Sequence, residues 1–148
     1  MFSNIKYPEG HNFEDIATTY KIINKANRVG ILNEYLYHYR QRPDSLMHDY
    51  STSTVLDSII AREQLYKFIK NNYPELSNIS YNALVFNYLQ YAVCAYKENK
   101  INDNLKKIGD SLRSVNIHNL QLSKKAFIML YLFRKHLLLF KLISKLTR

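Results

Sequence analysis

The sequence predicts a mainly α-helical fold, α+β at its N-terminal end: a bundle of about four to five helices with one or two short strands near residues 1–40. Two observations lead to this class. The 148 residues include only three glycines and three prolines, a scarcity that favours long helices over a many-turned sheet. Hydrophobic residues make up 47% of the chain, which is enough for one ordered core and argues against a disordered polypeptide.

Residues 1–50 are predicted to form a loop, a helix, a strand and a second loop. In the helix, apolar side chains recur at helical spacing over residues 13–23, and Asn12 is placed to cap its start. The strand is expected at 28–40, because this run is rich in aliphatic and aromatic residues on both of its faces. Pro43 ends it, since proline cannot donate a hydrogen bond to a ladder.

Residues 51–148 are predicted to form four helices. Serine or asparagine side chains precede each start, and such side chains accept hydrogen bonds from the free N–H groups of a first turn. The expected helices cover 51–72, stopped by Pro74, then 77–99, then a shorter helix after Asn102, and last a helix from Ser123 nearly to Arg148.

The predicted strand poses a structural problem, because no other part of the chain has a strong strand pattern apart from residues 1–7. A single strand leaves its backbone donors and acceptors without partners. Residues 29–39 are therefore expected to belong to a larger sheet or to pair with a second copy. For the isolated chain we expect a homodimer, since a twofold dimer lets one surface cover its own copy.

Polar and aromatic residues with a distinctive order lie in the first part of the chain. They are Tyr7-Pro8-Glu9-Gly10, Glu14-Asp15, Asn33-Glu34, Tyr37-His38-Tyr39-Arg40-Gln41-Arg42 and Ser45-Leu46-Met47. In order, spacing and residue type this run resembles the end of the catalytic domain of bacterial family 2 glycosyltransferases, which are inverting enzymes of the GT-A type. That family shows an aromatic-x-Glu-Gly stretch, a Glu-Asp pair opening a helix, an Asn-Glu-Pro-Leu-Tyr-Tyr-Tyr-Arg strand and then Arg-x-x-Ser. Tyr35 and His38 depart from the pattern.

The resemblance implies that the chain is the C-terminal part of such an enzyme. Residues 1–50 would be a remnant of its catalytic domain and residues 51–148 its C-terminal helical region. The whole enzyme would transfer a sugar from a nucleotide-sugar donor to an acceptor glycan on a cell-surface polysaccharide, glycolipid or glycoprotein.

The nucleotide-sugar-binding half is expected to be missing from this chain. Neither an Asp-x-Asp metal motif nor a glycine-rich phosphate loop occurs in the sequence. A divalent metal, Mg²⁺ or Mn²⁺, is expected in the full-length enzyme, where it would stabilise the leaving diphosphate. For this chain alone we expect no cofactor and no transfer activity.

Within the resemblance, Asp15 is the catalytic base that takes the proton of the acceptor hydroxyl, and Glu14 raises its proton affinity by like-charge repulsion. Arg40, Arg42 and Ser45 match a loop beside the diphosphate, an anion that guanidinium groups suit. His48 is a candidate metal ligand in the full-length enzyme only. Each assignment has an alternative: a Glu-Asp pair in a first turn also complements the helix dipole, and exposed arginines are often plain solvated charge.

The net charge of +9 belongs entirely to the second part of the chain. Residues 1–50 hold six basic and six acidic side chains, whereas residues 51–148 hold fifteen and six, and no acidic residue follows Asp110. This asymmetry indicates an anionic partner such as a membrane surface or phosphate groups. A nucleic-acid partner is not expected, because no helix-turn-helix, zinc-finger or ribonucleoprotein-type motif is present.

The predicted last helix pairs apolar residues with a basic stripe. Arg134, Lys135 and Lys141 interrupt its apolar run, so we expect it not to span a membrane but to lie on an anionic surface or to pack in the core with a solvated edge. The expected location is cytoplasmic, with peripheral binding to the inner membrane face. The alternative function is accordingly a non-catalytic helical module that binds a membrane or a protein partner through its basic C-terminal helices.

Two further residues are predicted to be structural. Cys94 is the only cysteine, which excludes an internal disulfide, and it lies in an apolar run typical of a buried thiol in a reducing compartment. His136 follows the apolar spacing of the last helix and is expected to be packed.

Overall fold

The computed structural model describes residues 5–40 and 51–146 and is helical throughout its ordered elements. Its α-helices are α1 (Glu14–Lys25), α2 (Thr52–Asn72), α3 (Ser77–Lys97), α4 (Asp103–Ser114), α5 (Lys124–Lys135) and α6 (Leu137–Leu146), with short 3-10 turns η2 (Pro74–Leu76) and η3 (Ile117–Asn119). No strand occurs within the described ranges. The mainly α-helical class predicted from the sequence is confirmed.

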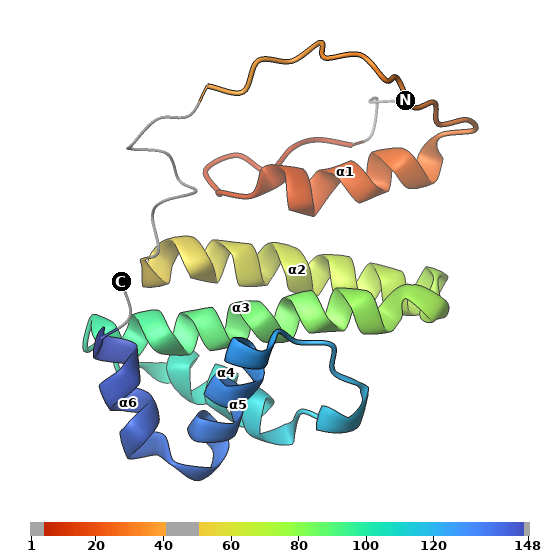
Figure 1. Cartoon of the computed structure of the whole chain (residues 1–148). Helices are drawn as coiled ribbons and strands as arrows, with labels where there is room; N and C mark the ends of the chain where they lie inside the picture. Colours follow the sequence, from red (N-terminus) through yellow and green to blue (C-terminus); the bar gives the residue numbers. More distant parts are fainter. Residues whose placement is uncertain (1–4, 41–50, 147–148) are drawn as a thin grey trace.

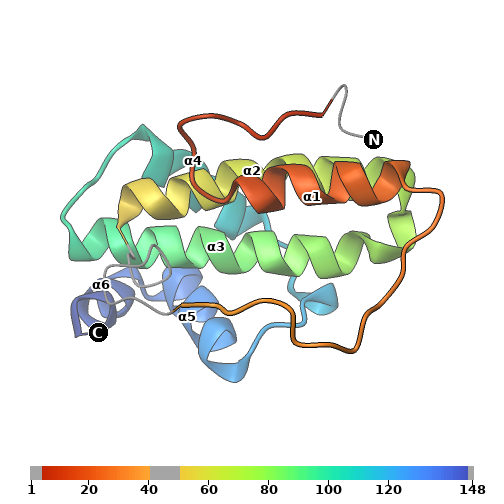
Figure 2. The same cartoon turned by 90° about the horizontal axis from the view of Figure 1, so that it is seen from above.

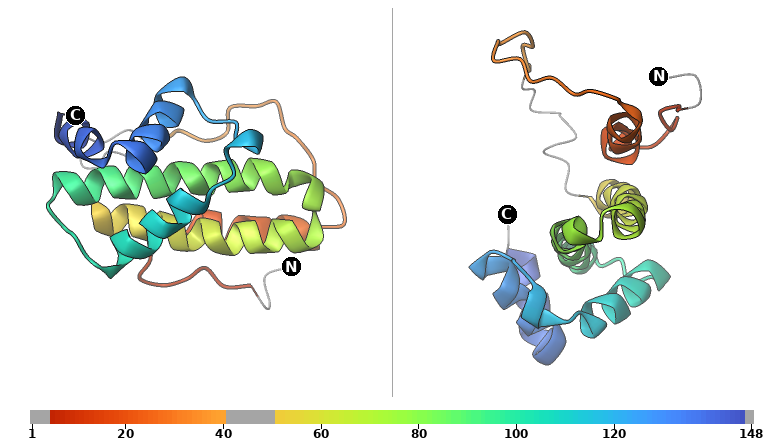
Figure 3. Two further views of the ribbon diagram at one scale, coloured as in Figure 1. Left: turned by 90° about the horizontal axis from the view of Figure 1, so that it is seen from below. Right: turned by 90° about the vertical axis from the view of Figure 1, so that its right-hand side faces the viewer.

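The centre of the molecule is an antiparallel pair formed by α2 and α3, which η2 joins (Figure 1). On one side, α1 lies along α2, and on the other side α4, α5 and α6 cover α3 (Figures 1 and 3). Seen from above, α1 follows the direction of α2 (Figure 2). Contacts fix this parallel arrangement, because Asn12 binds Asp57 near the start of both helices and Asn24 accepts from Tyr73 near their ends.

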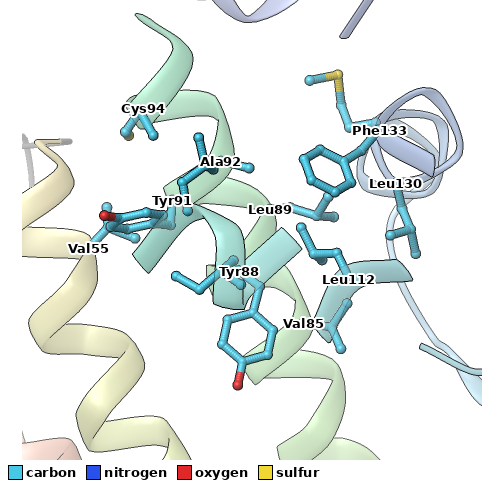
Figure 4. Close-up of a cluster of buried hydrophobic side chains, with 14 of the residues drawn as sticks. Val55, Val85, Tyr88, Leu89, Tyr91, Ala92, Cys94, Leu112, Leu130 and Phe133 are labelled. Carbon is cyan, nitrogen blue, oxygen red and sulfur yellow. The ribbon is translucent and has the colours of Figure 1, made fainter. Parts of the chain in front are cut away.

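The main core is built around α3, which contributes side chains to both of its neighbouring layers. Figure 4 shows Val55 of α2 on one side of this helix, and Leu112 of α4 with Phe133 of α5 on the other. Each such buried side chain contributes about 1.5–3 kcal/mol. The largest side chains with less than 2% exposure in the whole described chain are Tyr91, Phe140, Leu112, Leu130, Val85, Thr18 and Ser144.

Three predicted helix starts are confirmed by their capping bonds. The hydroxyl of Ser51 accepts from the Thr54 N–H at 3.3 Å, and Ser123 caps α5 in the same way. Asn102 accepts from the Leu105 N–H at 3.0 Å at the start of α4. These bonds satisfy backbone donors that have no partner inside the helix, which is why the starts could be predicted from single residues.

Two predicted caps differ in the structure. The residue that caps α1 is Phe13, in a left-handed conformation with φ of 61° and no side-chain capping bond, whereas Asn12 turns to Asp57 on α2. The start of α3 also has no side-chain cap, because the 3-10 turn η2 leads directly into it. In both places a tertiary contact or a preceding turn replaces the local hydrogen bond.

The single last helix predicted from Ser123 is wrong, because the helix breaks at His136 into α5 and α6. The φ and ψ angles of His136 are −135° and 62°, and this residue is exposed, not packed as predicted. The break lets α6 turn so that Phe140 packs edge-on against Phe133 and Tyr96, with ring centroids 5.1 Å and 5.9 Å apart. Burial of Phe140 therefore compensates for the interrupted backbone bonds.

The strand predicted at residues 28–40 does not form. Residues 26–40 leave the end of α1 and run away from the core (Figures 1 and 3). Their apolar side chains are exposed, with Ile31 at 91% and Tyr35 at 103%. The physical reason is the absence of a partner: no other described segment is extended in a position to form a ladder, so the backbone groups have nothing to pair with.

Candidate functional site

The predicted catalytic pair, Glu14 and Asp15, occupies the first turn of α1. Both side chains are exposed. The preceding chain turns sharply at Gly10, whose φ of 75° is readily adopted by glycine, and then at the left-handed Phe13. Acidic residues in this position also complement the positive end of the helix dipole.

The loop before the pair is anchored to α2 by Asp57. One oxygen of this carboxylate accepts from the backbone N–H of Asn12 at 3.3 Å and from its side-chain amide at 3.1 Å. The other oxygen lies 3.6 Å from the Nδ1 atom of His11. Asp57 thus fixes the position of α1, although the sequence analysis had not singled it out. No local sequence signal marks Asp57, because its partners His11 and Asn12 are more than forty residues away in the chain.

The positive charge of Arg62 on α2 acts on Asp15 through space, without a hydrogen bond or ion pair between the two side chains. Burial lowers the pKa of the Arg62 guanidinium, while the negative charge of Asp15 acts in the opposite direction. The Nε atom of Arg62 is buried without a hydrogen-bond partner. An arginine remains charged under these conditions, so Arg62 supplies a permanent positive charge that attracts the Asp15 carboxylate. Within the described residues, the Asp15 carboxylate accepts from the neighbouring Ile16 N–H alone, at 2.8 Å.

The other predicted site residues do not complete this cluster. Arg40 is exposed at the end of residues 26–40, and neither a hydrogen bond nor an ion pair joins it to Glu14 or Asp15. Arg42, Ser45 and His48 lie outside the described residues. The structure therefore brings together Asp15, Arg62 and the Asp57-anchored loop, and not the predicted diphosphate-binding set.

The described residues hold no group of three or more histidine, cysteine or acidic side chains arranged for a metal ion. His11 and Asp57 lie close together, but they are only two potential metal ligands, and they are paired with each other. The Mg²⁺ or Mn²⁺ expected for the full-length enzyme would need ligands from outside the described residues.

A second candidate region is the outer surface of α5 and α6. Arg134 and Lys141 are used inside the molecule, because Arg134 donates to the Val115 carbonyl at 3.0 Å and Lys141 lies over the Tyr96 ring. The other exposed apolar and basic residues of α5 and α6 form what we call the α5–α6 outer surface. Its exposed members are Phe127, Ile128, Tyr131, Leu138, Leu139, Leu142, Ile143 and Leu146, with Lys124, Lys135 and Lys145 among them.

This surface has basic groups but no acidic ones, since the chain contains no Asp or Glu after position 110. Among the described helices, none combines the length and apolar character needed to cross a bilayer. Basic and apolar side chains on the same exposed helical face are typical of surfaces that bind anionic interfaces.

Comparison of the chain with models of protein families, with curated proteins and with solved structures gives no match. The two candidate regions therefore stand on their residues and geometry.

Proposed function

We propose that this chain is the C-terminal region of an inverting glycosyltransferase that moves a sugar from a nucleotide-sugar to an acceptor glycan on a cell-surface polysaccharide, glycolipid or glycoprotein. In this proposal Asp15 is the general base and Glu14 its partner. Arg40, Arg42 and Ser45 bind the diphosphate, and His48 is an additional metal ligand in the full-length enzyme. The chain alone is inactive.

One observation supports this assignment beyond the sequence resemblance. Glu14 and Asp15 are both exposed in the first turn of α1, although one Asp15 oxygen accepts from the Ile16 N–H, as a helix-stabilising carboxylate would. The other Asp15 oxygen has no hydrogen-bond partner among the described residues, and the positive charge of Arg62 acts on this carboxylate from α2. Its carboxylate is therefore accessible to an acceptor hydroxyl, which is the geometry a general base needs.

The test begins with the DNA immediately upstream of the Met1 codon. An in-frame sequence encoding a strand-rich half with Asp-x-Asp would allow the longer protein to be expressed and assayed with nucleotide-sugars and Mg²⁺ or Mn²⁺. In that protein Asp15→Asn should leave donor binding intact and reduce transfer by at least about 100-fold, the usual scale for a general base. Purified 1–148 should release no nucleotide diphosphate under the same conditions.

Asp103→Asn provides a matched control, since Asp103 occupies the first turn of α4 as Asp15 occupies that of α1. Both substitutions remove a favourable helix-dipole interaction of about 0.3–1 kcal/mol, so their effects on stability should be similar. Equal transfer by the Asp15→Asn and Asp103→Asn enzymes would make Asp15 a helix-stabilising residue and refute the catalytic assignment. Turnover by 1–148 alone would refute the inactive-fragment assignment.

The second candidate function is binding of an anionic membrane surface by the α5–α6 outer surface. The observation that favours it is the exposure of Leu138 at 76% and Leu146 at 82% on a helix that carries only basic charge. Apolar side chains would enter the interface while lysines contact lipid phosphates. The peripheral location at the inner membrane face, proposed from the sequence, would follow from such binding.

Co-sedimentation with lipid vesicles tests this candidate. The chain should bind vesicles containing phosphatidylglycerol, bind phosphatidylcholine vesicles weakly, and dissociate in 0.5 M salt, because the Debye length falls well below 10 Å. Leu138→Ser with Leu142→Ser should reduce binding, whereas Lys106→Ser with Lys107→Ser on α4 should reduce it less. Equal binding by both double variants would show that charge alone causes the association and that the α5–α6 outer surface has no special part in it.

A further inference from the structure

An open groove separates α3 from α5 on the side of the core that faces away from α2. Its volume is about 330 Å³, at the lower end of the range of small-molecule sites. The α3 wall includes Leu89 and Val93, and the α5 wall includes Ala126 and Met129. Both walls are therefore apolar, and the small side chain of Ala126 leaves space between them.

The α3 wall of the groove extends along that helix for several turns. Leu89, Val93 and Lys97 are four residues apart and line it in succession. At 1.5 Å per residue this stretch covers roughly 12 Å along the helix. An alkyl chain can lie along such a stretch of apolar side chains.

The charge of the groove is one-sided. Each wall contributes one lysine, Lys97 from α3 and Lys125 from α5, and both side chains are exposed. Neither is within ion-pair distance of an acidic group in the described part of the chain. No aspartate or glutamate lines the groove. Its only other polar linings are the uncharged Gln90 and Ser123.

We propose that this groove binds a single-chain amphiphile with an anionic head, of the fatty carboxylate class. The alkyl chain lies between Leu89, Val93 and Met129, where it leaves water, and the carboxylate accepts from the ammonium groups of Lys97 and Lys125. The unpaired lysines select against neutral or cationic heads, since nothing in the lining offers a negative charge. This site is separate from Asp15 and from the α5–α6 outer surface, and it does not depend on either proposed function.

Calorimetric titration of the purified chain with matched ligands tests the proposal, at concentrations below micelle formation. Decanoate should bind at least about tenfold more tightly than decan-1-ol, and decyltrimethylammonium should show no saturable binding. Octanoate should bind about 15-fold more weakly than decanoate, because each buried CH₂ changes affinity about fourfold. Equal affinities for decanoate and decan-1-ol, or no dependence on chain length, would overturn the proposal.

Variants separate the groove from general electrostatic attraction. Lys97→Gln with Lys125→Gln should weaken decanoate about tenfold, and these exposed positions leave the core intact. Lys106→Gln with Lys107→Gln removes the same charge from α4 outside the groove and should change affinity by less than about twofold. Val93→Phe should block binding by filling the space, with helicity checked by circular dichroism. An equal loss in both lysine pairs would overturn the proposal.

Discussion

Residues 51–146 and residues 26–40 are both rich in apolar side chains, yet the first region buries many of them in a core and the second exposes its large ones. In the helical body, Tyr91 and Phe140 are 1% and 0% exposed, whereas Leu32 and Leu36 of the segment are 70% and 72% exposed. A helix satisfies its backbone hydrogen bonds internally and needs only one apolar face covered. An extended segment needs partners for its backbone as well. Apolar composition alone therefore does not determine burial; the availability of a second surface does.

The helix α1 is intermediate between these two regions in how much of its surface is buried. It contacts the body mainly through α2, with Tyr20 packed against Phe68 at a ring-centroid distance of 4.8 Å and Ala17 and Thr18 buried. The carboxylates of its first turn stay exposed at the N-terminal end of the same helix, although Glu14 has the helical spacing of the buried Ala17 and Thr18. A helix that packs along its length can thus keep charged groups exposed at its first turn, which is the arrangement that the glycosyltransferase proposal uses.

The largest loss of stability is expected when a buried side chain of the helical body is truncated. Phe140→Ala should lower the free energy of unfolding by about 3–5 kcal/mol, because Phe140 is fully buried and packs edge-on against two aromatic rings. Leu138→Ala on the same helix removes an exposed side chain and should change stability by less than about 0.5 kcal/mol. Urea unfolding followed by circular dichroism measures both. Similar values would mean that α6 is not part of the cooperative core.

Much of the helical body was predictable because its signals are local. Ser51, Asn102 and Ser123 each cap the helix that follows, and Pro74 follows the end of α2. The break at His136 was not predictable, since the apolar spacing continues through it and only the tertiary position of Phe140 favours the turn. The strand at residues 28–40 was mispredicted for a related reason: its pattern fits a sheet, but strand formation depends on a partner that residues 5–40 and 51–146 do not contain.

The candidate site was predictable only in part. Glu14 and Asp15 were placed in the first turn of a helix, as the structure shows. Their neighbours, Asp57 and Arg62, are more than forty residues away in sequence and approach only because α1 packs parallel to α2. No local motif contains that information. The assignment of Asp15 as a base, and of Arg40 as a diphosphate ligand, stays a prediction.

A smaller effect on stability is expected at the contact between the start of α2 and the end of α3. The Glu98 carboxylate at the end of α3 accepts from the Thr52 N–H at 2.8 Å and from the Thr52 hydroxyl at 2.9 Å, and it pairs with Lys100 at 2.7 Å. Burial acts to raise the pKa of Glu98, but the bonds from Lys100 and Thr52 outweigh it and leave this pKa below its ordinary value. Glu98→Gln should therefore lower stability at pH 7 by about 1 kcal/mol.

The pH dependence of this difference has a defined sign. Because the folded pKa of Glu98 lies below its unfolded value near 4.5, the stabilisation is complete above pH 4.5 and is lost as the pH falls through the folded pKa. The unfolding free energies of the wild-type and Glu98→Gln chains should thus converge in acid. Urea titrations between pH 7 and pH 3 measure the gap, and a gap that stays constant would contradict the ionised contact.

The smallest effect on stability is expected in residues 26–40. Leu32→Ser with Tyr35→Ser replaces side chains that are 70% and 103% exposed, so the free energy of unfolding should change by less than about 0.5 kcal/mol. The same double variant should weaken self-association, because contiguous exposed apolar residues and unpaired backbone favour contact with a second chain. Sedimentation velocity at micromolar concentration should show a dimer for the wild type and a monomer for the variant.

Ile101→Ser is the matched control, since Ile101 is also an exposed aliphatic residue, at 73%, but belongs to the body. It should leave the dimer intact. If the wild-type chain is monomeric, the homodimer predicted from this segment is wrong. If Ile101→Ser dissociates the dimer equally, the body and not the segment forms the interface. Loss of the dimer in the segment variant alone would show that residues 26–40 form the interface between the two copies.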